Sequence, residues 1–259
     1  MDLETKPCFF SCGGATLAYR RTPGVLPGVV FLTGFKSDMT GTKAERLEAW
    51  AKTAGRAFLR FDYQGHGASS GRFDEGAIGL WSQDALAIID HLTEGPQVLV
   101  GSSMGGWIMT LVARARPQRI AGLVGIAPAP DFSEDLIWDQ LDPDARRALK
   151  ESGSFAIPSA YDPEPTVITH NFIEDGRRHL VLRAPISFSG PTRLLHGMQD
   201  PDVPWQTSLR LAETLTASDV QITLIKDGDH RLSREADLDL LISTVDRLTA
   251  QIEASLKKA

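Results

Sequence analysis

The chain has 259 residues, of which 42% are hydrophobic, and its formal net charge at pH 7 is -6. This length and composition predict a single α/β domain with enough apolar residues for a core on both faces of a sheet. The acidic balance argues against nucleic acid as a partner, because phosphate binding needs a basic face. No apolar run is long enough to predict a membrane span, and the N-terminus has no leader pattern, so we expect a cytoplasmic protein.

Strands and helices alternate along the first half of the chain. Short strands at 9–11 and 16–20, joined by a turn at 12–14, predict an antiparallel hairpin at a sheet edge. The apolar run 28–33 (GVVFLT) is typical of a strand that is buried on both faces. The other elements predicted here are helix 42–54, strand 57–62, helix 74–92, strand 97–100, helix 106–116 and strand 120–126.

The second half contains strand 192–195, helix 205–215, strand 220–225 and a closing helix at 238–256. Repeated alternation of this kind predicts a mostly parallel sheet with helices on both faces. No clear buried strand occurs in residues 131–184, where we expect a helical piece at 144–151 and polar turns such as 174–178. So long an interruption is usually functional, which predicts a core of residues 1–130 and 185–259 with a lid at 131–184.

The run Gly101-Ser102-Ser103-Met104-Gly105 has the form G-x-S-x-G and lies between a predicted strand and a predicted helix. A serine in its centre sits on a sharp turn at the helix N-terminus, where the helix dipole favours developing negative charge. Side chains two residues before and after it would clash in that turn, so glycine is needed at both places. We therefore expect Ser103 to be a nucleophile. Ser102 is the alternative, although glycines do not flank it symmetrically.

A serine hydroxyl needs a base that accepts its proton. His230 directly follows the last predicted core strand, which places it at the carboxyl edge of the sheet, where Ser103 is also expected. His66, in the sequence YQGHG, is the alternative base at the same edge. His196 also follows a strand, but it opens the turn HGMQD and is expected to shape that turn. The remaining histidines, interpreted as surface or packing residues, are His91, His170 and His179.

The acid of such a site accepts a hydrogen bond from the second imidazole nitrogen and fixes the tautomer of the base. Asp200 ends the turn HGMQD after predicted strand 192–195. The order Ser103, Asp200, His230 is one of the known chain orders of nucleophile, acid and base. Asp202, two residues further on, and Asp131, which also follows a core strand, are the alternatives.

An oxyanion hole needs two backbone N–H groups that point at the developing charge. We expect one from Met104, which follows the nucleophile, and the other from Phe35 in the loop after the strand at 28–33. No cluster of cysteine and histidine has the spacing of metal ligands, so we expect no metal site.

Several segments together resemble the α/β-hydrolase superfamily over nearly the whole chain: FDYQGHGASSG, GSSMGGW, HGMQDPDVPW and GDHR. More narrowly, GTK after the oxyanion loop, GSSMGGWIM and DHR resemble the mitochondrial acyl-protein thioesterases of the α/β-hydrolase-domain-containing group, which are also described as acyl-glucuronide esterases. The resemblance implies an α/β-hydrolase fold and hydrolysis of small-molecule or acyl-protein esters and thioesters, without metal or cofactor. C–C bond hydrolysis, cofactor-free haloperoxidase chemistry and a non-catalytic binding role stay as alternatives.

The predicted lid is rich in apolar residues, which we expect to line an acyl pocket or to pack the lid on the core. Among the residues expected to contact substrate are Trp138 and Phe155 in the lid, with Trp107 and Trp205 flanking the site from the core. Arg177 and Arg178 are interpreted as a solvated pair in a turn, with binding of an acidic group as the alternative. The apolar lid residues are Phe132, Ile137, Trp138, Leu141, Phe155, Ile157, Tyr161, Val167, Ile168, Phe172 and Ile173.

Overall fold

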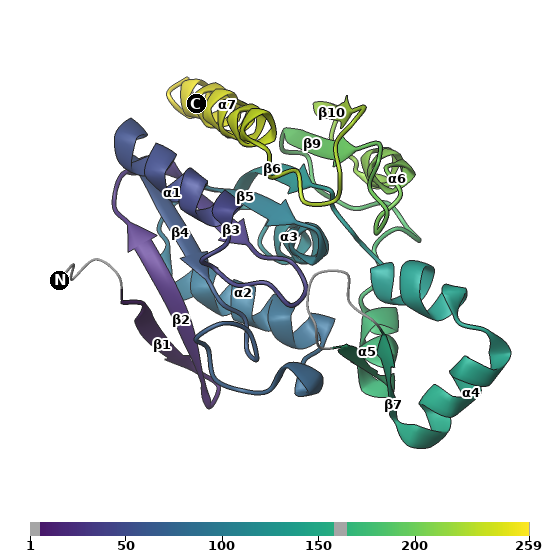
Figure 1. Cartoon of the computed structure of the whole chain (residues 1–259). Helices are drawn as coiled ribbons and strands as arrows, with labels where there is room; N and C mark the ends of the chain where they lie inside the picture. The colour runs from purple at the N-terminus through teal and green to yellow at the C-terminus, as the bar shows by residue number, and fades with distance from the viewer. Residues whose placement is uncertain (1–5, 158–164, 259) are drawn as a thin grey trace.

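A computed structural model describes residues 6–157 and 165–258 of the chain (Figure 1). Its central sheet has eight strands in the order β1-β2-β4-β3-β5-β6-β9-β10. The pairs β1–β2 and β2–β4 are antiparallel, and the other neighbours are parallel. The strands are β1 (Cys8–Cys12), β2 (Ala15–Thr22), β3 (Val25–Leu32), β4 (Arg56–Phe61), β5 (Gln97–Ser102), β6 (Ile120–Ile126), β9 (Thr192–Gly197) and β10 (Val220–Ile225).

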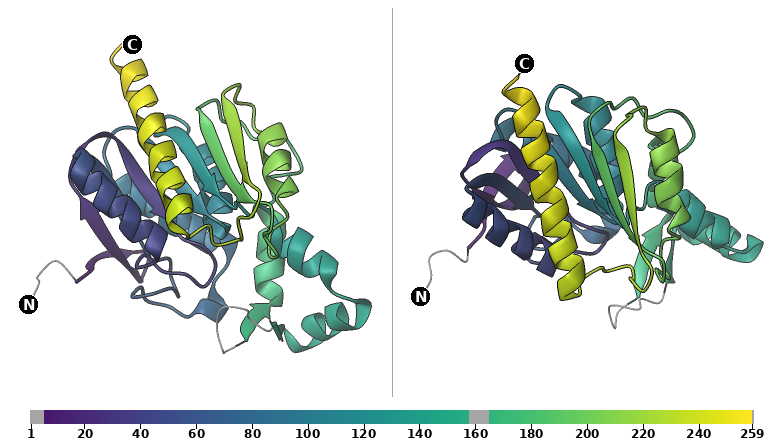
Figure 2. Two further views of the ribbon diagram at one scale, coloured as in Figure 1. Left: turned by 45° about the horizontal axis from the view of Figure 1, so that its top comes forward. Right: turned by 90° about the horizontal axis from the view of Figure 1, so that it is seen from above.

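Helices cover both faces of this sheet (Figure 2). Alternating side chains of β3 explain the two layers: Val29 and Phe31 belong to a core cluster with α1 and α7, while Val30 and Leu32 belong to a second cluster with α2, α3 and α6. The predicted α/β-hydrolase architecture is therefore confirmed. The helices are α1 (Thr42–Ala54), α2 (Ile78–Leu92), α3 (Met104–Ala115), α6 (Gln206–Thr214) and α7 (Glu235–Leu256).

The described part of the predicted insertion, residues 131–157 and 165–184, projects from one end of the sheet, with α4 at its outer end (Figure 1). It contains a π-helical turn (Ser133–Ile137), a 3-10 turn (Trp138–Gln140), α4 (Pro143–Ser152), α5 (His170–Arg178) and the antiparallel pair of β7 (Ser154–Ile157) with β8 (Thr166–Thr169). Contacts between α5 and α2 join it to the core. Tyr161, one of its predicted apolar residues, lies outside the described residues.

Two predicted elements differ from the structure. The polar turns expected at 174–178 are wrong, because these residues form the end of α5, which begins where the Thr169 hydroxyl accepts the N–H of Phe172. The helix expected from residue 74 begins only at Ile78, since Phe73–Glu75 is a separate 3-10 turn and residues 76–77 are extended. That break matters for the site, because it brings the 3-10 turn beside the insertion.

None of the helices in the described part of the chain combines the length and the apolar content that a membrane span needs.

Candidate active site

Ser103 occupies a strained turn between β5, which ends one residue before it, and α3, which begins one residue after it. Its φ and ψ are 53° and -117°, a conformation that side chains rarely adopt. A Cβ on Gly101 would lie 2.3 Å from the carbonyl oxygen of Gly105, and a Cβ on Gly105 would lie 2.1 Å from that of Leu32. A side chain at either position would therefore clash with the backbone, as the sequence predicted.

His230 and Asp200 reach Ser103 from the loops that follow β10 and β9. Nε2 of His230 lies 3.1 Å from Oγ of Ser103, and its Nδ1 lies 2.8 Å from Oδ2 of Asp200. An ionised carboxylate only accepts hydrogen bonds, so Nδ1 carries the hydrogen, and Nε2 of the neutral ring is free to accept the serine hydroxyl hydrogen. The structure thus brings the three predicted residues into one hydrogen-bonded chain.

Asp200 is held as a carboxylate by its surroundings. Its side chain is fully shielded from solvent, and its Oδ1 accepts the backbone N–H groups of Asp202 and Val203 at 2.9 and 2.8 Å. Burial opposes its ionisation, but hydrogen bonds from His196 and His230, the His230 charge and the backbone N–H of Val203 outweigh burial and hold the pKa of Asp200 well below its ordinary value. The carboxylate of Asp200 is therefore charged at neutral pH.

The alternative acids have other surroundings. Asp131 is buried, and its carboxylate accepts the N–H groups of Val181 and Leu182 at the far end of the insertion, so it closes that segment. Asp202 is exposed, although its carboxylate, that of Asp200 and the His230 ring place ligand-type atoms within 4.8 Å of one another. Both nitrogens of His230 are already engaged within the hydrogen-bonded chain, which accounts for this grouping without a metal ion.

The alternative base, His66, packs among aromatic rings. Its ring is buried between the rings of Phe73 and Trp81, and its Nδ1 donates to the carbonyl of Gln64. Burial lowers the pKa of His66 to about 4, despite the opposing effects of that hydrogen bond and of the Asp38 charge. His66 is therefore a neutral packing residue at pH 7. His179, another of the six histidines, lies beside Gly79 of α2.

Two backbone segments meet beside Ser103. A Cβ on Gly34 would lie 3.4 Å from the Cβ of Ser103, which places the loop after β3, and with it Phe35, next to the nucleophile. Met104 is the first residue of α3, and the first N–H groups of a helix have no acceptor within the helix. The two predicted oxyanion donors therefore lie on segments that flank Ser103.

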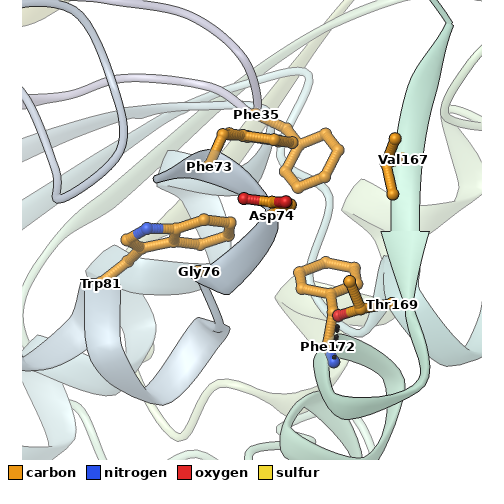
Figure 3. A pocket seen from close by; sticks show the side chains of 8 residues that line it. All are labelled: Phe35, Phe73, Asp74, Gly76, Trp81, Val167, Thr169 and Phe172. Atoms are coloured by element: carbon orange, nitrogen blue, oxygen red, sulfur yellow. Dashed lines mark hydrogen bonds between the residues drawn. The ribbon is translucent and has the colours of Figure 1, made fainter. Parts of the chain in front are cut away.

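A narrow pocket opens beside the same loop (Figure 3). Its cavity volume is only about 10 Å³. The ring centroid of Phe35 lies 4.8 Å from that of Phe73, in an edge-to-face arrangement, and 5.3 Å from that of Phe172, in a tilted one. Apolar surface of this kind suits a hydrocarbon chain. The lining residues are Phe35, Phe73, Asp74, Gly76, Trp81, Val167, Thr169 and Phe172.

The four side chains that the sequence singled out for substrate contact do not line this pocket. Trp107 is completely buried and donates its indole N–H to the carbonyl of His179, so it fastens α5 to α3. The Trp138 ring is covered by three cationic side chains, those of Arg146, Lys150 and Arg177. Phe155 is partly buried on β7, and Trp205 lies at the start of α6.

The interpretation of Arg177 as a solvated turn residue is wrong. Its guanidinium lies in α5 and binds the carboxylates of Glu134 and Glu174 while it covers Trp138. Arg178, in contrast, is exposed and pairs with Asp175. Sequence reasoning missed two aromatic residues of the pocket, Trp81, which lies within the segment predicted as one continuous helix at 74–92, and Phe73, which directly precedes that segment.

Comparisons with known proteins agree with this geometry. A family model described as serine aminopeptidase, S33 matches residues 28–171. The mitochondrial palmitoyl-protein thioesterase ABHD10 of Mus musculus is 43% identical over 233 residues, which cover 90% of this chain and 78% of the mouse protein. The solved structure of alpha/beta hydrolase domain-containing protein 10 from mouse is 41% identical, with a TM-score of 0.90, and the match covers 96% of this chain and 100% of that one.

A putative hydrolase from Agrobacterium vitis S4 gives the same values: 41% identity, a TM-score of 0.90, and coverage of 96% and 100%. The predicted resemblance is confirmed by these matches. The chain belongs to the α/β-hydrolase family of serine hydrolases and, within it, to the group that contains ABHD10.

Proposed function

We propose that this serine hydrolase cleaves acyl thioesters and esters, with Ser103 as nucleophile, His230 as base and Asp200 as the acid that orients the base. One observation carries the proposal: His230 contacts the Ser103 hydroxyl with one ring nitrogen and the buried Asp200 carboxylate with the other. A non-catalytic binding protein has no need of this arrangement, nor of the strained backbone at Ser103.

In the first half of the reaction, His230 accepts the hydroxyl proton of Ser103 as its oxygen attacks the acyl carbonyl. The N–H groups of Phe35 and Met104 stabilise the oxyanion of the tetrahedral intermediate. The intermediate collapses, and the imidazolium gives its proton to the departing thiol or alcohol, which leaves an acyl group on Ser103. Asp200 stabilises the imidazolium while it exists.

In the second half, His230 accepts a proton from a water molecule, whose oxygen attacks the acyl group on Ser103. A second oxyanion forms in the same place and collapses, the proton returns to the serine oxygen, and the free acid leaves. Apart from the substrate and this water molecule, the cycle uses only groups that the described chain supplies.

The acyl chain is proposed to enter the aromatic pocket, because Phe35 belongs both to the lining and to the loop that flanks Ser103. Val167, Thr169 and Phe172 come from the insertion, which supports its proposed role as a lid over one wall of the pocket. The relatives named palmitoyl-protein thioesterase favour acyl-protein thioesters as substrates. An acyl-glucuronide has less support, because Arg177 is already paired with two carboxylates.

The relatives are named mitochondrial, so they do not support the cytoplasmic location expected from the sequence, which stays a prediction.

The test of the proposed function is Ser103→Ala, assayed with an octanoyl thioester and with a fluorophosphonate probe. We expect turnover to fall by about 10⁴-fold or more and labelling to vanish, while the melting temperature stays near that of the wild type. Ser102→Ala is the control, and it should keep labelling. Labelling that survives in Ser103→Ala and disappears in Ser102→Ala would refute the assignment, and a wild-type protein that never labels would point to a binding role.

A further inference from the structure

A second histidine, His196, contacts the same carboxylate oxygen of the proposed acid as His230 does. His196 lies in β9, and its side chain is fully buried. Its Nε2 lies 3.2 Å from Oδ2 of Asp200 and 3.0 Å from the carbonyl oxygen of Val203. Its Nδ1 lies 2.7 Å from the hydroxyl oxygen of Ser208 on α6. Neither the sequence pattern nor the proposed reaction gives this histidine a part beyond shaping its turn.

The hydrogen bonds fix the tautomer of the ring. A carbonyl oxygen and a carboxylate both accept hydrogen bonds, so the nitrogen that faces Val203 and Asp200 must carry the hydrogen. In the neutral ring, Nδ1 then accepts the hydroxyl hydrogen of Ser208. The Nε2–H group is therefore shared between the carbonyl that closes the turn and the carboxylate of the proposed acid.

This contact completes the set of donors around Asp200. Oδ1 accepts the N–H groups of Asp202 and Val203, while Oδ2 accepts those of His230 and His196. A carboxylate offers about four lone-pair positions, and all are filled. Without the donor from His196, Oδ2 would keep a single partner, and a buried carboxylate with an unfilled position is costly and less fixed in orientation.

We propose that His196 is a positioning residue of this site, which holds Oδ2 of Asp200 between two imidazole N–H groups and thereby fixes the orientation and the charge that Asp200 presents to His230. The inference rests on the proposed function, since it assigns His196 to the same Ser103 site. It goes beyond that function because it adds a residue that never touches the substrate.

The positioning role has a signature in the pH profile. The ionisable groups around this carboxylate are His196 in β9, Asp202 in its own loop and His230 after β10, while Ser208 from α6 is neutral. A hydrogen bond from His196 withdraws part of the carboxylate charge. When that donor is lost, the charge of Asp200 acts more fully on His230 and the pair binds its proton more tightly. The acid limb of the kcat/KM profile should then move to higher pH.

The test compares three variants of the wild-type enzyme. In His196→Asn the side-chain amide is too short to reach Asp200, whereas in His196→Gln the amide N–H reaches the position of Nε2. Ser208→Ala removes only the partner on the far side of the ring. Each variant is assayed with the octanoyl thioester from about pH 5 to 9, with its melting temperature measured alongside.

We expect His196→Asn to lose about 10- to 100-fold in kcat at unchanged KM, with its acid limb at higher pH. His196→Gln should recover most of the rate and the wild-type limb. Ser208→Ala should melt earlier but keep the wild-type limb. A folded His196→Asn enzyme with the kcat and acid limb of the wild type would overturn the proposal, as would His196→Gln with the full loss of His196→Asn. Activity that survives Ser103→Ala would instead overturn the proposed function.

Discussion

At the scale of single residues, the elbow around Ser103 depends on glycines that have no room for a side chain. A methyl group on Gly105 would lie 2.1 Å from the backbone oxygen of Leu32 and 2.8 Å from that of Thr33, just before the proposed oxyanion loop. We predict that Gly105→Ala forces α3 away from β3, costs about 1–3 kcal/mol of stability and lowers kcat sharply.

The measurements are urea unfolding and turnover of the octanoyl thioester. Gly41→Ala is the matched control, because a Cβ there would meet nothing closer than 3.6 Å and only the N-cap preference of α1 would change. Equal kcat in the Gly105→Ala and Gly41→Ala enzymes would contradict the packing argument.

The residues of the hydrogen-bonded chain could be found from the sequence, whereas the pocket could be found only in part: Val167 and Phe172 were among the expected lining residues, and Phe73 and Trp81 were not. Ser103, Asp200 and His230 each follow a core strand, so the parallel topology alone places them at one edge of the sheet. The lining comes from segments without such a constraint: a 3-10 turn that supplies Phe73, and an insertion that supplies Val167 and Phe172. Where those rings meet is decided by packing between elements, which no spacing along the chain encodes.

At the scale of elements, the same contrast separates the core from the insertion. Helix α1 and strands β6 and β10 have the predicted bounds, because continuous apolar runs and helical spacing are enforced by burial. Helix α5 was misread as turns, since its sequence after Ile173 is polar. It is nevertheless held against the core, where Phe172 and Ile173 are buried and the Asp175 carboxylate accepts the N–H of Gly79.

The next prediction concerns Val167, a residue of β8 in the insertion. Val167 lines the pocket but is 40% exposed, so its side chain can change without loss of core packing. Each methylene that is buried contributes about 0.8 kcal/mol, so kcat/KM should rise up to a few-fold per added acyl carbon. The cavity of about 10 Å³ has room for about one water-sized group, so all but the shortest acyl chains should extend past Val167.

Val167→Phe should therefore lower kcat/KM for long acyl thioesters and leave short ones nearly unchanged. The measurement is kcat/KM for a series of acyl chain lengths on one thiol. Val25→Phe is the control, because Val25 is exposed and lies at the end of β3 that is remote from the Phe35 loop. If kcat/KM of the wild type did not depend on chain length, or if the two substitutions had equal effects, the acyl chain would not bind in this pocket.

At the scale of the whole molecule, buried ionisable groups set how stability depends on pH. Burial raises the pKa values of Asp62, Asp84 and Asp131, which accept backbone N–H groups in three different loops. These carboxyls take up protons more readily in the folded state than in the unfolded chain, so each one stabilises the fold as the pH falls towards 4. His66 has the opposite effect on the pH dependence of stability, because burial among aromatic rings lowers its pKa and keeps it neutral.

The last prediction concerns His66. Its pKa is about 4 in the folded protein and about 6.5 in an unfolded chain, so the unfolded state binds the extra proton between these values. The stability that neutral His66 contributes is therefore complete above pH 6.5 and is lost as the pH falls towards 4. His66→Asn keeps a donor for the Gln64 carbonyl but cannot titrate. Urea unfolding should show the wild type losing about 2–3 kcal/mol relative to this variant between pH 7 and 4.5. Tyr63→Phe, which removes a buried hydroxyl without a hydrogen-bond partner from the same cluster, should keep the wild-type slope. Parallel stability curves for the wild type and His66→Asn would show that this ring is protonated as easily in the folded protein as in the unfolded chain.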